Sequence, residues 1–374
     1  MKKTTLALLF ITIICAVGCT GGRKDGQQSQ SGNIMHHSTL LNIELRDQYT
    51  YVKFRNPWDT TKTLQNYVLI PKGKDVPHDL PEGTIVRTPI KNAVVYSAVH
   101  CALFEELGEQ KSVSGVCDVE YIDLAFVKKG LKDGSIKNLG NSLQPNIEEI
   151  ISLAPDAILL SPFENSGGYG ALEKTGIPII ECDDYMETSP LGRAEWTVFF
   201  GLLTGKEEVA REIFRNVSER YRELAESVSS VKHRPTVMCD LQTGQTWYQP
   251  GGNSTIGQMY KDAGADYIFS ANGNSGSISM SPEQVLTQCK EADFWLLKYN
   301  SDKDISYSDI KADKGIYAMF RPFKEKRIYG CNTKVNRYFE ETTFHPERLL
   351  ENLIGIFHPE IHGTGKYKYF KLVE

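Results

Sequence analysis

The sequence predicts an α/β protein: two α/β lobes with mostly parallel sheets, joined by one long α-helix. Short apolar runs alternate with helix-like segments over residues 92–181 and again from residue 236 onward, as is typical of parallel strands covered by helices on both faces. The longest helical pattern, residues 206–228, lies between these two regions, and its apolar side chains recur at helical spacing. A chain of 374 residues is long enough for two lobes.

The first 45 residues are predicted to be a signal and a tether. Two lysines precede an apolar run, residues 6–17, that is too short to span a bilayer. The run ends in Ala16-Val17-Gly18-Cys19, which resembles a lipobox, where the signal (1–18) is removed and the cysteine is diacylated; an ordinary secretory signal with a chance cysteine is the alternative. We therefore expect lipid on Cys19 and a flexible tether over residues 19–45.

The first lobe is expected at residues 46–190, and it begins with a hairpin-like β extension. Apolar runs that are β-rich or follow helix-like segments predict its strands at 51–54, 67–70, 93–96, 113–116, 157–160 and 177–180. Helical spacing and a terminal glycine predict helices at 100–107 and 147–153, and a further helix around 170–175.

A linking helix is expected at residues 191–232 and a second lobe at 233–374. The same patterns predict strands of the second lobe at 236–241, 267–269, 294–297 and 327–329, and helices at 256–263, 282–288 and 346–357.

Composition and cysteine spacing exclude several classes of function. A formal net charge of −5 and the lack of a basic tract argue against nucleic acid as a partner. The cysteines are widely spaced with no C-x-x-C pair, so no zinc or redox motif is indicated. Cys101 and Cys117 are the pair that we expect to be bridged, if any is. His358 and His362 are four residues apart, but Pro359 interrupts the helix, so we expect both on the surface rather than in a metal site.

One local pattern occurs in both halves. Asn146 and Ser281 are good N-caps for the helices that follow, and each helix carries a glutamate at its second position, Glu148 and Glu283. An acid in the first helical turn interacts favourably with the helix dipole, by about 0.3–1 kcal/mol, which explains these glutamates without a function. The alternative is that each lobe offers one carboxylate to a basic partner surface.

The segments 148–160, 192–206, 251–265 and 283–297 resemble a family of substrate-binding proteins with two lobes and one linking helix. That family serves ABC importers for cobalamin, ferric siderophores and haem, and the resemblance covers residues 92–363. It implies a metal-chelate ligand, no catalytic residues, and no cofactor or metal site of its own, although the ligand can contain Fe or Co. It also implies a monomer, lipid-anchored at the periplasmic face of the cell envelope, whose partner is a permease dimer with its ATPase. Glu148 and Glu283 match the two glutamates with which the family docks arginines of the permease.

The ligand is expected where the carboxyl ends of the strands converge between the lobes. Aromatic rings there would cover a flat corrin or porphyrin face, and Arg337 would pair with a carboxylate. His100 could contact a ligand or haem iron, although a hydrogen-bonded histidine at a helix start is the alternative. The expected ligand-binding residues are Ser97, His100, Asp118, Tyr121, Ser142 and Phe163 in the first lobe, and Trp247, Tyr248, Tyr299, Asn300, Arg337 and Tyr338 in the second.

An exported enzyme is the rival interpretation. The sequence contains no G-x-S-x-G elbow, H-E-x-x-H motif, P-loop or dinucleotide-binding fingerprint. An enzyme that processes metal chelates, or a lipoprotein that captures haem or corrinoid without an ABC partner, stays open at this point. The ligand also stays open between cobalamin, haem and a ferric siderophore.

Overall fold

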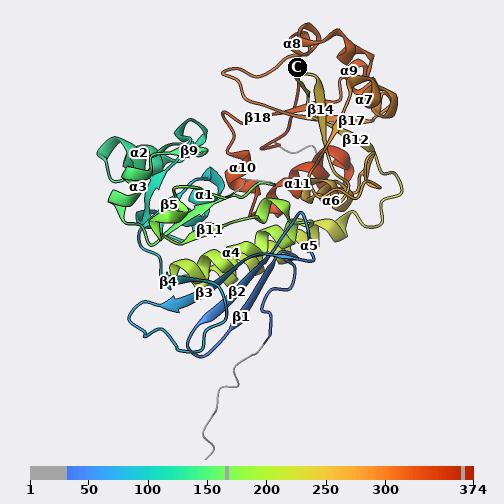
Figure 1. Ribbon diagram of the computed structural model, residues 1–374. Coiled ribbons are helices and arrows are strands. Elements are labelled where there is room, and N and C mark those ends of the chain that lie inside the picture. Colours follow the sequence, from blue (N-terminus) through green and yellow to red (C-terminus); the bar gives the residue numbers. More distant parts are fainter. Residues whose placement is uncertain (1–31, 165–167, 364–366) are drawn as a thin grey trace, which may run out of the picture.

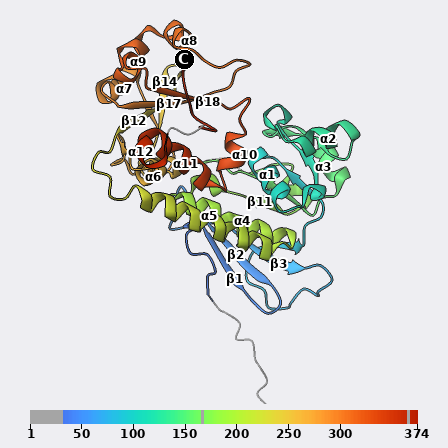
Figure 2. The ribbon, with the colours of Figure 1, turned by 180° about the vertical axis from the view of Figure 1, so that it is seen from behind.

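The computed structural model describes residues 32–164, 168–363 and 367–374. Two α/β lobes stand on a base made of two helices, and a small N-terminal sheet lies on the other side of those helices (Figures 1 and 2). The predicted α/β architecture with two lobes is therefore confirmed.

The first lobe contains a five-stranded parallel sheet in the order β11-β10-β5-β6-β7. Val94 and Ile158 face one apolar layer, whereas their neighbours Val95 and Leu159 face another. Burial on both faces explains why the two strands that contain these residues, β5 and β10, are apolar throughout. Its elements are β5 (Ala93–Val95), α1 (Ala98–Glu106), β6 (Val113–Val116), α2 (Ala125–Asp133), β7 (Lys137–Asn138), β8 (Gly140–Asn141), β9 (Gln144–Pro145), α3 (Ile147–Leu153), β10 (Ala157–Leu160) and β11 (Ile179–Glu181). The helix expected around 170–175 is only a 3-10 turn, Glu173–Thr175.

The second lobe contains a sheet in the order β15-β12-β17-β18-β19, parallel except for β19, and a three-stranded antiparallel sheet, β13-β14-β16. Its strands are β12 (Thr236–Cys239), β13 (Gln242–Thr243), β14 (Thr246–Pro250), β15 (Asp266–Tyr267), β16 (Ser277–Met280), β17 (Phe294–Tyr299), β18 (Ile328–Asn332) and β19 (Lys371–Leu372). Its helices are α6 (Thr255–Asp262), α7 (Pro282–Cys289), α8 (Tyr307–Asp313), α9 (Arg321–Lys324), α10 (Tyr338–Thr342), α11 (Pro346–Phe357) and α12 (Pro359–His362).

The linker is a pair of helices, so the expected single helix over 191–232 is wrong. Helix α4 (Pro190–Thr204) ends at Gly205, whose φ of +74° is a left-handed conformation that favours glycine. Helix α5 (Glu207–Ser227) then runs alongside α4 (Figures 1 and 2). Gly201 permits this close packing, because a Cβ there would lie 2.4 Å from Cβ of Ala210.

The N-terminal sheet covers the face of α4 that points away from the first lobe. It consists of β1 (Leu41–Leu45), β2 (Thr50–Arg55), β3 (Thr63–Pro71) and β4 (Thr84–Thr88); β1 to β3 are antiparallel, as the predicted hairpin requires, and β4 is parallel to β3. The ring of Phe54 lies 4.9 Å from that of Trp196 and 5.3 Å from that of Phe199, both on α4. This packing buries α4 almost entirely.

The expected tether is too long at its C-terminal end. Residues 33–45 belong to the fold: Met35 and Leu40 are buried, and residues 41–45 form β1. Cys19 and the signal lie outside the described residues. Among the residues that are described, no helix is long and apolar enough to cross a membrane.

The six described cysteines are all free and buried, so the bridge considered between Cys101 and Cys117 is wrong. The physical reason is that Cys101 lies in the apolar layer beneath α1, whereas Cys117 lies in the layer on the opposite face of the same sheet. His358, expected on the surface, is also buried, and its Nε2 lies 3.1 Å from the carbonyl oxygen of Gly264.

Candidate ligand-binding cleft

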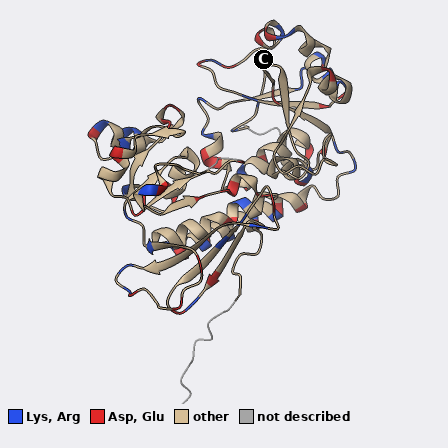
Figure 3. Cartoon of the chain, in the orientation of Figure 1, with Lys and Arg blue, Asp and Glu red and all other residues tan. Residues whose placement is uncertain are grey.

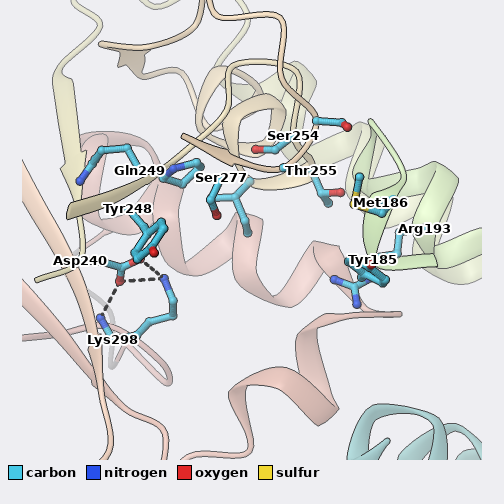
Figure 4. Close-up of a pocket in the computed structure, with 14 residues that line it drawn as sticks. Tyr185, Met186, Arg193, Asp240, Tyr248, Gln249, Ser254, Thr255, Ser277 and Lys298 are labelled. Carbon is cyan, nitrogen blue, oxygen red and sulfur yellow. Dashed lines mark hydrogen bonds and ion pairs between the residues drawn. The ribbon is translucent and has the colours of Figure 1, made fainter. Parts of the chain in front are cut away.

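A cavity of about 360 Å³ opens where the linker meets the second lobe. A smaller cavity of about 120 Å³ adjoins it and continues toward α10. Figure 4 shows Tyr185 and Arg193 on one side of the larger cavity and Asp240 and Lys298 on the other. The larger cavity is lined by Tyr185, Met186, Arg193, Asp240, Tyr248, Gln249, Pro250, Ser254, Thr255, Ile256, Ser275, Gly276, Ser277 and Lys298.

Asp240 and Lys298 form an ion pair on the second-lobe side of this cavity. Both carboxylate oxygens of Asp240 lie 2.8 Å from Nζ of Lys298. The backbone of Asp240 adopts a left-handed conformation (φ +54°), and its carbonyl accepts hydrogen bonds from the indoles of Trp247 and Trp295, at 3.1 and 2.9 Å. Burial lowers the pKa of Lys298, but the Asp240 carboxylate outweighs this effect and holds the pKa above its usual value. Lys298 is therefore a fixed cation.

Arg193 reaches the cavity from the first turn of α4 and is held by a buried carboxylate. Its Nε donates to Asp184 at 2.9 Å, and the other oxygen of Asp184 lies 2.8 Å from Nε2 of His100. Burial raises the pKa of Asp184, but Arg193 and His100 outweigh it, so the pKa lies below its usual value. His100 is thus the hydrogen-bonded helix-start histidine of the alternative interpretation, buried against Phe200.

A third cavity, of about 450 Å³, lies at the carboxyl ends of β5 and β10 in the first lobe. Tyr96 and Leu160 line it together with two of the predicted residues, Ser142 and Phe163. The carboxylate of Asp118 accepts a hydrogen bond of 3.1 Å from the backbone N–H of Ser142 and so helps to position Ser142.

The structure brings some of the other predicted residues to cavities. Tyr248 lines the larger cavity, and Tyr338 lines the smaller one although it is 95% buried. Tyr121 and Asn300 are exposed but line none of the three cavities.

Four of the predicted residues have structural contacts instead. Trp247 is wholly buried in the core of the second lobe. Ser97 caps α1 by accepting from the backbone of Val99. The hydroxyl of Tyr299 bonds the loop that follows it, at Asp304 and Ile305. Arg337 pairs with Glu105 of the first lobe at 3.1 Å, so its charge is already partly neutralised.

Sequence reasoning missed Arg193, Asp240 and Lys298. A signal was present for two of them: Asp240 directly follows an apolar strand, and Lys298 interrupts another, at the strand ends where ligands bind in α/β proteins. Nothing local distinguishes Arg193 from any other charged residue of a helix.

Glu148 and Glu283 are both exposed, in the first turns of α3 and α7. Of these two helices, only α7 has the full capping box, between Ser281 and Gln284; in α3 the backbone N–H of Asn146 donates to Leu139 instead. Figure 1 shows α3 and α7 on separate lobes, so each lobe presents one of these carboxylates. Figure 3 shows basic and acidic residues interspersed over both lobes.

Two α/β lobes on a helical linker, with a cavity between linker and lobe, form the architecture of a two-lobed binding protein. Residues 93–335 match the family model described as periplasmic binding protein, and the chain belongs to that family.

The chain is also similar to curated relatives and to solved structures. An uncharacterized lipoprotein of Methanocaldococcus jannaschii is 25% identical, over 76% of this chain and 69% of its own length. A protein of Halobacterium salinarum named cobalamin-binding protein is 25% identical, over 56% of this chain and 51% of its own. An ABC-type Fe3+-hydroxamate transport system structure from Saccharomonospora viridis has the same fold, with a TM-score of 0.56, 19% identity, and coverage of 72% of this chain and 94% of its own.

Proposed function

We propose that this protein is the substrate-binding lipoprotein of an ABC importer. It captures an iron chelate (a siderophore or haem) or cobalamin between its lobes and delivers it to the permease. The observation that carries the proposal is the cavity between linker and second lobe, which Arg193, Asp240 and Lys298 help to line, in a chain of the periplasmic binding protein family. The names of the halobacterial and methanogen relatives support a chelate ligand and a lipid anchor, respectively.

The proposed location is the periplasmic face of the cell envelope. Cys19 carries the lipid in this proposal, and the short segment between Cys19 and residue 33 is the tether. In this proposal the protein acts as a monomer, which agrees with a cavity lined by residues of one chain.

A fluorescence titration against haem, cobalamin and a panel of ferric siderophores tests the ligand class. The indoles of Trp247 and Trp295 are hydrogen-bonded to Asp240 at the cavity wall, so ligand binding should change their emission. We expect saturable binding of one class of ligand. If no compound of the panel changes the fluorescence, the proposed class of ligand is wrong. Chemical turnover of a bound chelate would favour an enzyme.

Reversal of both docking charges tests the delivery step. Glu148→Lys together with Glu283→Lys should abolish uptake of the ligand into cells while its affinity in solution stays unchanged, because both side chains lie outside the three cavities. Glu208→Lys with Glu219→Lys, two exposed residues of α5, changes the net charge equally and should leave uptake intact. Undiminished uptake by the first double variant would show that these glutamates do not dock a permease.

A further inference from the structure

Two cations line the cavity of about 360 Å³ between the linker and the second lobe. Among its lining residues, Arg193 and Lys298 are cations and Asp240 is the only acid. The two cations reach it from separate parts of the fold, the linker and the second lobe, and face each other across it (Figure 4). Both also line the adjoining smaller cavity, so the positive charge lies where the two cavities meet.

The guanidinium of Arg193 is oriented by one hydrogen bond, and its two terminal nitrogens remain available to a ligand. Its Nε is bound to Asp184, which is itself buried and held on its other oxygen by His100. Within the described residues, no hydrogen bond engages the two terminal nitrogens of Arg193, and its side chain is 22% exposed. A guanidinium fixed through Nε with both terminal nitrogens free has the geometry for bidentate contact with an oxyanion.

Lys298 is held in a comparable way. Two of its three ammonium hydrogens are directed to Asp240, which leaves one donor for the cavity. Asp240 is kept in place by the two tryptophan indoles and by the backbone N–H of Lys298 at 3.1 Å. The ammonium therefore has a defined position, and its side chain is 25% exposed.

The N-terminus of α6 adds donors to the same wall. Ser254 caps this eight-residue helix by accepting from the backbone of Gly257, and Thr255 and Ile256 of its first turn line the cavity. The backbone N–H groups of Thr255 and Ile256 have no partner in the part of the chain that the structure describes. The first amides of a helix favour an anion, and here they supplement two fixed cations.

From these contacts we propose that the cavity of about 360 Å³ between the linker and the second lobe binds an oxyanion. The oxyanion is a carboxylate or phosphate group carried by the ligand. Arg193 and Lys298 contact the anion, and the first-turn amides of α6 add donors. Asp184 and Asp240 are positioning residues that hold the two cations. The identity of the molecule that carries the anion rests on the proposed function, whereas the anion site itself does not.

Small anions test the site directly. The melting temperature of the full chain is measured in sodium phosphate and in sodium citrate, each against sodium chloride at the same ionic strength. When the anion concentration is ten times its dissociation constant, specific binding should raise the melting temperature by about 2 °C. The variants are Lys298→Gln, and Arg193→Lys, which keeps a charge beside Asp184 but lacks the fork. Lys129→Gln, exposed on α2, is the control.

We expect the rise in the wild type and the control, and an anion affinity weakened about tenfold or more in both cavity variants. Phosphate and citrate also stabilise proteins in general, through exclusion from the surface. An equal rise in all four proteins would therefore be that general effect and would overturn the proposal, as would no rise in the wild type. A response to citrate alone or to phosphate alone identifies the group that the site takes.

Paired ligands separate this inference from the proposed function. Haem is compared with its dimethyl ester, and cobalamin with cobinamide, which lacks the nucleotide and its phosphate. If one of these chelates binds, the form with the anion should bind about tenfold or more tightly in the wild type and lose that preference in Lys298→Gln. Equal binding of both forms would overturn the anion site and leave the proposed function standing. Binding of small anions without binding of any chelate would overturn the proposed function and leave the anion site standing.

Discussion

Two glutamates near the start of the linker hold the segment by which the chain enters the fold. The carboxylate of Glu195 accepts from the backbone N–H groups of His36, His37 and Ser38, at 2.8–3.1 Å. Glu187 accepts from Thr39, Leu40 and the indole of Trp196 in the same way. A buried carboxylate is stable only when it is fully hydrogen-bonded, and successive backbone amides meet that requirement here.

Glu195→Gln should therefore destabilise the protein although it preserves the shape of the side chain. The amide places a donor where Oε1 accepts from the backbone N–H of His36, and it removes the negative charge that strengthens all of these hydrogen bonds. We expect the free energy of unfolding in urea to fall by about 2–3 kcal/mol. Glu219→Gln, an exposed residue of α5, should change it by less than about 0.5 kcal/mol. Equal stability of the two variants would show that the carboxylate does not hold this segment.

At the scale of elements, the linker is a helical hairpin clamped between two sheets. The N-terminal sheet packs on one side of α4 and the first lobe on the other. Helix α5 packs along α4, and α11 of the second lobe packs on α5. This layered packing stiffens the connection between the lobes, because any bend in α4 would open a tightly packed core.

Gly201→Ala tests how close the two linker helices must be. Alanine favours a helix over glycine, but its Cβ would overlap Ala210 at 2.4 Å and crowd the backbone of Lys206 at 3.0 Å. We expect overpacking to prevail and to lower the free energy of unfolding by about 1–2 kcal/mol. Adding Ala210→Gly should restore part of this loss, since it removes the nearest atom. A Gly201→Ala protein that is more stable than the wild type would contradict the packing described here.

At the scale of the whole molecule, the lobes touch through a second contact besides the linker. The segment around α10 leaves the second lobe and docks on α1 of the first, where Phe344 joins the apolar core. Arg337 pairs with Glu105, and His345 lies 2.5 Å from Glu106 and 2.9 Å from Glu347. Residues 337–345 thus bridge the lobes on the side opposite the N-terminal sheet.

The contact of His345 makes stability depend on pH. Burial lowers the pKa of His345, but hydrogen bonds to Glu106 and Glu347 outweigh it and raise the pKa to about 9. Because the pKa is higher in the folded state, the stabilisation is fully present below about pH 6.5 and is lost as the pH rises through 9. Its upper limit is about 3 kcal/mol.

Urea unfolding between pH 6 and pH 10 measures this effect. The free energy of unfolding of the wild type should fall over that range by more than that of His345→Gln, which cannot titrate there. Parallel curves for the two proteins would show that His345 is not charged in the contact between the lobes. Glu347 also pairs with Arg348.

Several elements could be predicted from the sequence because local physics decides them. The helix expected at 346–357 has the observed bounds, since Pro346 starts it and apolar residues at helical spacing continue it. The strands at 113–116 and 157–160 are also as expected. The second of them is apolar throughout and is buried at every position, as a short apolar run predicts. The break at Gly205 was missed, since a single glycine within a helical pattern permits a turn without requiring one.

The candidate site could be predicted only in part. Tyr248, Ser142 and Phe163 line cavities, as expected. Trp247 in β14 and His100 in α1 are buried instead. The sequence could not predict this, because the same pattern of residues occurs whether an aromatic side chain points to a cleft or to the core.

By itself, the sequence determined the α/β class, the two lobes and most of their strands and helices, because periodicity and capping act over a few residues. Only the tertiary structure decided that residues 36–40 bind Glu187 and Glu195, and that Arg193 and Lys298 face one cavity although they are far apart in the chain. The physical reason is that such contacts join distant segments. Their partners are set by how whole sheets and helices pack, and no local pattern of residues records that packing.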